Sequence, residues 1–124
     1  MRLVARVLMS GAFAVGLSLA GAGAALADFG AIAFSPQNGA YGYSYGAGTR
    51  AQAERIAMSN CQANGSGCRL LVYFRNACGA LAVGNGNGYG FAWAGSRGQA
   101  EGRAMQECRN QTSSCRIVAW SCSG

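Results

Sequence analysis

The acidic residues are the first candidates for catalysis, and the chain has four of them: Asp28, Glu54, Glu101 and Glu107. Two carboxylates facing each other can act as the acid and the base or nucleophile of a glycoside hydrolase. The 124 residues include neither histidine nor lysine. Their absence excludes a Ser-His-Asp triad, a Cys-His pair, an imidazole zinc site, a Schiff base and a P-loop. Acid-base chemistry would therefore have to come from the carboxylates.

The positions of these carboxylates favour structural roles. Glu54 and Glu101 fall in the first turns of two predicted helices, each four residues after an arginine, where an ion pair and the helix dipole favour an acidic group. Asp28 is expected to be the frayed amino terminus of the mature chain. We therefore predict that the protein is not an enzyme and uses no cofactor or metal. The alternative is a small hydrolase of cell-wall or other polysaccharide that uses Glu54 and Glu101.

Aromatic residues form the most informative pattern. Tyr41, Tyr43 and Tyr45 alternate with small residues, and Tyr89, Phe91 and Trp93 repeat the alternation. Successive side chains of a strand point to opposite faces, so each set places three rings on one face. The large faces could pack together as the core, leaving the small faces to receive helices, or some rings could form an exposed binding platform. The first interpretation is favoured because a small chain has few other core residues. Tyr41, Tyr43 and Trp93 are the rings most expected to be partly exposed, because their polar edges can face water. The candidate binding surface comprises Tyr41, Tyr43, Tyr45, Tyr89 and Trp93.

The six cysteines predict three disulfides. Cys61 ends a predicted helix and Cys68 begins the next strand after a glycine-rich turn, which makes a local bridge easy, and Cys108 and Cys115 repeat this arrangement. The remaining pair is Cys78 with Cys122, which would suit antiparallel neighbours. Six cysteines allow 15 connectivities, and the internal repeat selects this one. A thiolate metal cluster is disfavoured because the six-residue gaps are longer than those of zinc motifs.

The amino-terminal region predicts a cleaved signal peptide over residues 1–27. Arg2 and Arg6 precede an apolar run from Val7 to Leu19, and Ala25-Leu26-Ala27 fits the cleavage motif. Removal lowers the formal net charge from +6 to +4, because eight arginines and four acidic groups remain in residues 28–124. We expect a secreted or envelope-located product without a membrane segment. Such a compartment is oxidising and favours disulfides.

The mature chain, residues 28–124, reads as one domain made of two repeats, about 29–76 and 77–124. Residues 30–34 match 79–83, residues 41–45 match 89–93, and residues 49–54 match 96–101. Each repeat predicts two strands, a helix and a third strand. The strands are 30–35, 41–46 and 69–75, then 79–84, 89–94 and 116–121. The helices begin at Thr49 and Ser96, each with glutamine three residues later as in a capping box.

The predicted fold is therefore α+β, an internally duplicated β-β-α-β unit with six strands, two helices and pseudo-twofold symmetry, stapled by disulfides. The order of the strands stays open. The tight turn between Arg75 and Gly79 suggests that the two halves join as antiparallel neighbours. The Cys78–Cys122 bridge suggests a different neighbour for the same strand.

Over roughly residues 30–122 the chain resembles a family of small exported bacterial proteins, the domain-of-unknown-function family 4189 (DUF4189). The resemblance rests on the Gly30-Ala31-Ile32-Ala33-Phe34 start, the Tyr-Gly-Tyr-Ser-Tyr-Gly strand from Tyr41, the alanine-rich helix ending at Cys61, and their repeat through Cys108 and Cys115. It implies a secreted cysteine-rich module with disulfide roles for the six cysteines. It implies no catalytic residue.

Together these features predict a small secreted binding or effector module that recognises a protein or a cell-envelope component. Nucleic acid is a disfavoured partner, because the arginines are scattered along the sequence without a basic run.

Overall fold

The computed structural model describes residues 27–124, so the predicted signal peptide lies outside the described residues except for Ala27. The elements follow the predicted order closely. They are β1 (Phe29–Phe34), β2 (Tyr41–Ala47), α3 (Arg50–Gln62), β3 (Arg69–Arg75), β4 (Ala77–Val83), a short 3-10 turn η3 (Asn85–Asn87), β5 (Tyr89–Ala94), α4 (Arg97–Gln111) and β6 (Arg116–Ser123). No helix within 27–124 has the length and apolar character needed to cross a membrane.

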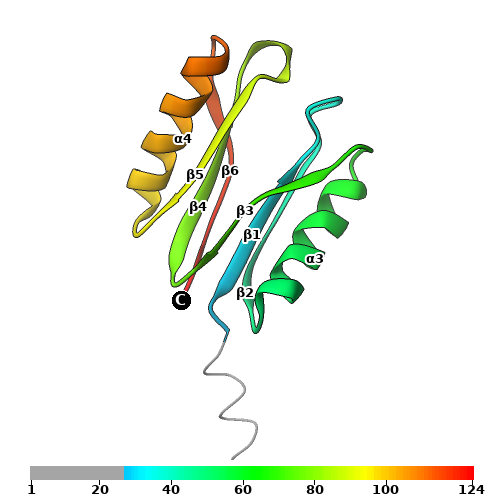
Figure 1. The fold of residues 1–124 in the computed structure, drawn as a ribbon, viewed down its shortest axis with the longest axis vertical. Helices are drawn as coiled ribbons and strands as arrows, with labels where there is room; N and C mark the ends of the chain where they lie inside the picture. Colours follow the sequence, from blue (N-terminus) through cyan, green and yellow to red (C-terminus); the bar gives the residue numbers. More distant parts are fainter. Residues whose placement is uncertain (1–26) are drawn as a thin grey trace, which may run out of the picture.

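The strands form two antiparallel sheets of three strands, one for each repeat. The strand orders are β2-β1-β3 and β5-β4-β6, so the first strand of each repeat is central and the other two are edges. The two sheets face each other, and α3 and α4 cover the opposite outer faces (Figure 1). This arrangement confirms the predicted duplicated β-β-α-β unit and its pseudo-twofold symmetry.

The junction between the repeats differs from one expectation. β3 pairs with β1, whereas β4 pairs with β5 and β6, so the prediction that the halves join as antiparallel neighbours is wrong. The chain passes from one sheet to the other at Asn76, which has a φ of 50° and donates its backbone N–H to the Asp28 carbonyl at 3.0 Å. A new layer is needed here because the large face of each sheet is buried only when the two faces meet.

Small residues let each helix approach its sheet closely. Ala53, Ala57 and Cys61 of α3 are buried against the small face of the first sheet. A Cβ atom added to Gly42 would lie 2.9 Å from the Asn60 carbonyl carbon, so glycine is required at this contact. The predicted helix starts are confirmed. Thr49 Oγ1 accepts from the Gln52 N–H at 3.1 Å, and Ser96 Oγ accepts from the Gln99 N–H at 3.3 Å.

The large faces form the core between the sheets, where Ile32, Phe34 and Leu81 are fully buried. Phe74, with 2% of its surface exposed, inserts its ring between the two sheets. A Cβ atom at Gly30 would lie 2.6 Å from the Phe74 ring, and one at Gly79 would lie 2.7 Å from it. Ser121 occupies the equivalent position of the second repeat. The two halves are therefore alike in backbone and unlike at this core position.

All six cysteines are paired as the repeat predicts. Cys61–Cys68 and Cys108–Cys115 each tie the end of a helix to the strand that follows, and Cys78–Cys122 joins directly opposed residues of β4 and β6. No bridge links the two repeats. Three disulfides in so short a chain indicate an oxidising, extracytoplasmic environment.

Candidate functional site

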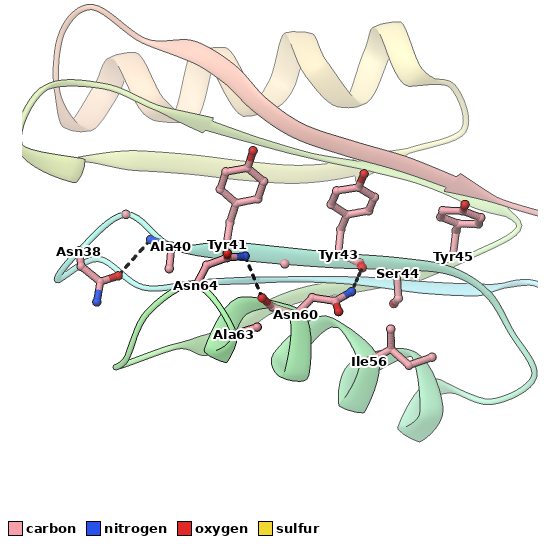
Figure 2. Close-up of a pocket in the computed structure, with 12 residues that line it drawn as sticks. Asn38, Ala40, Tyr41, Tyr43, Ser44, Tyr45, Ile56, Asn60, Ala63 and Asn64 are labelled. Carbon is pink, nitrogen blue, oxygen red and sulfur yellow. Dashed lines mark hydrogen bonds between the residues drawn. The ribbon is translucent and has the colours of Figure 1, made fainter.

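A groove of about 980 Å³ runs along the edge of β2, and we call it the β2 groove. The edge strand forms its floor. Tyrosine rings stand on one side and α3 lies on the other (Figure 2). The lining residues are Asn38, Gly39, Ala40, Tyr41, Gly42, Tyr43, Ser44, Tyr45, Ile56, Asn60, Ala63 and Asn64.

The tyrosines of β2 form a row of exposed rings. Tyr41, Tyr43 and Tyr45 are 37%, 41% and 65% exposed, and all three point away from α3 (Figure 2). Pairing of β1 with β2 places Tyr43 opposite the buried Ile32, so the row shares the large face of the sheet. The central strand supplies the core and the edge strand supplies the exposed rings. Both interpretations of the aromatic pattern thus apply, each to a different strand.

Asparagine side chains stabilise the opposite wall of the β2 groove. Asn60 Nδ2 donates to the Tyr43 carbonyl at 3.1 Å, and Asn64 Nδ2 donates to the Asn60 carbonyl at the same distance. At one end, Asn38 Oδ1 accepts from the Ala40 N–H at 3.1 Å. The groove therefore combines aromatic rings with neutral amides, and none of its lining residues is charged.

A second groove, of about 470 Å³, occupies the equivalent place along β5 and includes Glu107 and Gln111. Tyr89 presents less of its ring to a partner than the predicted binding surface requires, because the ring packs against Phe34 with 4.9 Å between ring centroids. Trp93 is 56% exposed, in agreement with the prediction that it is partly exposed. Phe91, outside the predicted surface, is 37% exposed; its alignment with Tyr43 was the available signal.

Each repeat also carries an arginine stacked on an aromatic ring. The Arg50 guanidinium lies 3.8 Å from the centre of the Tyr73 ring, and that of Arg97 lies 3.7 Å from the Trp120 ring. The hydrogen bond to Glu54 raises the pKa of Arg50, a residue that is cationic at physiological pH in any case. This stacking was not predictable from the sequence, because it depends on where the helix starts relative to the last strand.

The carboxylates are not assembled into a catalytic pair. Glu54 binds Arg50 at 2.9 Å and Glu101 binds Arg97 at 2.8 Å, as predicted. Their helices cover opposite outer faces, with both sheets between them (Figure 1). Asp28 is ordered by an ion pair with Arg75 at 3.2 Å, so the expectation that it is frayed is wrong. Within residues 27–124 no cluster of three or more acidic, cysteine or histidine residues could hold a metal ion.

The family model described as Domain of unknown function (DUF4189) matches residues 29–122. The chain belongs to this family. The DUF4189 domain is also similar to the NMR structure of Rv1813c from Mycobacterium tuberculosis, with a TM-score of 0.59 and 26% sequence identity, covering 99% of this chain and 97% of that chain. No curated protein matches it. Neither description names an activity or a ligand.

Proposed function

We propose that this protein is a secreted, non-enzymatic binding module that recognises a protein or a cell-envelope component through the β2 groove. The predicted signal peptide and the three disulfides support secretion.

The observation that carries the proposal is the row of exposed rings formed by Tyr41, Tyr43 and Tyr45. A contiguous patch of exposed aromatic rings on a small domain marks an interaction site more often than apolar residues scattered singly over the surface do. Tyrosine suits this role because its ring offers apolar contact area and its hydroxyl offers a hydrogen bond. Tyrosine is accordingly enriched among the residues that contribute most to binding.

The row stands on a rigid support. β2 pairs with β1 over most of its length, and α3 packs directly on Gly42. The Cys61–Cys68 bridge fixes the end of α3 beside the same strand. A surface held in its binding conformation loses little entropy when a partner binds, so a modest groove can give useful affinity.

The arrangement of the acidic groups supports a non-enzymatic role. A hydrolase built on Glu54 and Glu101 would need the two carboxylates on either side of one substrate, within about 10 Å of each other. They lie on helices that cover opposite faces of the domain, and each is engaged by an arginine (Figure 1). Neither glutamate lines the β2 groove.

The test is capture of a partner from envelope and secreted extracts by the immobilised, disulfide-bonded protein. We expect the Tyr43→Ala/Tyr45→Ala variant to lose a partner that the Phe91→Ala/Trp93→Ala variant keeps, since the latter removes the equivalent rings of the other repeat. Circular dichroism would verify that both variants fold. Capture that is unaffected by loss of the two tyrosines, or glycan hydrolysis that disappears in Glu54→Gln/Glu101→Gln, would refute the proposal.

A further inference from the structure

We infer that the β2 groove binds a neutral, linear oligosaccharide. This inference rests on the proposed function and assigns a chemical class to the ligand of the same groove.

The absence of charged residues in the β2 groove indicates the charge of its ligand. All twelve lining residues are uncharged, although residues 28–124 carry eight arginines and four acidic groups. A nucleic acid or an anionic lipid would require arginines along the groove to meet its phosphates. A charged glycan would likewise leave its charges without counter-ions. The electrostatics of the groove therefore match an uncharged ligand.

The spacing of the tyrosine row favours a ligand with repeating units. Residues two apart on a strand are separated by about 6.7 Å, so Tyr41, Tyr43 and Tyr45 extend over roughly 13 Å. The faces of pyranose rings carry C–H groups that pack on aromatic rings, while their hydroxyls lie around the rim. Three separate rings in a line fit successive sugars of a chain better than one compact molecule (Figure 2).

The amides supply hydrogen bonds suited to sugar hydroxyls. The Nδ2 atoms of Asn60 and Asn64 are held by backbone carbonyls, which fixes the planes of both side chains. Within the described residues, neither Oδ1 atom accepts a hydrogen bond in the structure. A hydroxyl can both donate to such an oxygen and accept from the remaining amide N–H. The side of the groove formed by α3 therefore presents neutral amides in fixed orientations.

An extended peptide that adds to the edge of β2 is the competing occupant. Strand addition would require the outward main-chain groups of β2 to be available along the strand. The Tyr43 carbonyl, at the middle of β2, already accepts from Asn60 Nδ2 at 3.1 Å. A peptide strand would have to break this bond, whereas a sugar chain stacked on the rings would not.

The experiment titrates neutral hexasaccharides of glucan, chitin, mannan and xylan into the ¹⁵N-labelled, disulfide-bonded protein, with hexagalacturonate as the anionic control. We expect a neutral hexasaccharide to shift the amide signals of β2 and α3. Tyr43→Ala should weaken that binding about tenfold, from loss of one aromatic contact. Phe91→Ala, the matched change in the second repeat, should alter it less than twofold, about the limit of the assay.

Three results would overturn the inference. These are no binding of any neutral hexasaccharide at millimolar concentration, a preference for hexagalacturonate, or equal losses in Tyr43→Ala and Phe91→Ala. Shifts in the β2 amides on adding extended peptides would assign the groove to strand addition instead. If partner capture depends on Tyr43 and Tyr45 while no sugar binds, the oligosaccharide fails and the proposed binding function stands. If neither holds, both fail.

Discussion

Phe74 is a core side chain whose loss should destabilise the fold strongly. Its ring lies between backbone glycines of both sheets, with Gly30 on one side and Gly79 on the other. Replacing it with alanine would leave a cavity that neither glycine can fill, because neither has a side chain to move inward. The substitution therefore tests whether the two sheets are held together chiefly by this core.

The expected loss can be estimated from burial. A buried aromatic side chain removes roughly 150–250 Å² from water, which corresponds to roughly 4–6 kcal/mol at about 25 cal/mol per Å². Alanine keeps part of this area, and Phe→Ala changes in cores cost about 3–5 kcal/mol. We expect Phe74→Ala to lower the free energy of unfolding by about 4 kcal/mol, a large share of the roughly 5–15 kcal/mol typical of a domain. Phe74→Leu, which fills most of the space, should cost about 1.5 kcal/mol.

Guanidinium denaturation followed by tryptophan fluorescence, with the disulfides intact, measures these differences. Phe91→Ala is the matched control, because it removes the same ring from an edge strand where 37% of the residue is exposed. It should cost less than about 1 kcal/mol. If Phe74→Ala cost no more than Phe91→Ala, the inter-sheet core would not be the main source of stability. Should Phe74→Ala fail to fold, the comparison of Phe74→Leu with Phe91→Leu would decide.

Two further predictions concern the cross-links and the glycines. Replacing both Cys78 and Cys122 with serine should lower the free energy of unfolding by about 4 kcal/mol, against about 2.4 kcal/mol for Cys61 and Cys68, because the sequence separations are 44 and 7 residues. Urea denaturation of the two double variants would show equal losses if loop length were irrelevant. Gly42→Ala should destabilise by about 2 kcal/mol because the new methyl group meets α3. Gly102→Ala, on the open side of α4, should stabilise by about 0.5–1 kcal/mol; melting curves that moved in the same direction would contradict this reasoning.

Local signals predicted most of the fold. Each of these signals depends on a few neighbouring residues: the capping residues Thr49 and Ser96, the alternation in β2 and β5, and the spacing of the cysteines. The same signals occur in both repeats, so a prediction for one repeat supported the prediction for the other. The passage of the chain from the first sheet to the second at Asn76 was not predictable in the same way. A short turn between two strands looks alike whether the strands pair or enter different sheets, and the choice depends on burying two large faces that lie far apart in the sequence.

The candidate site was predicted in outline. Sequence alternation identified the rings of β2, but it could not separate Tyr41, which is exposed, from its counterpart Tyr89, which packs on Phe34 of the other sheet. That difference arises from the contact between the sheets. The asparagine wall was also missed, because Asn60 reaches the groove only after α3 has packed on Gly42.

Within residues 27–124, the peptide chain at Asn76 is the one covalent connection between the repeats, since each disulfide closes inside its own repeat. An ancestor with a single β-β-α-β unit would have exposed the face that carries Ile32 and Phe34, and a second copy could have covered it by twofold pairing. The inter-sheet core has the pseudo-twofold geometry of such a homodimer interface. Because both halves belong to one chain, this interface does not have to be self-complementary, and phenylalanine at position 74 can face a repeat that has serine at position 121.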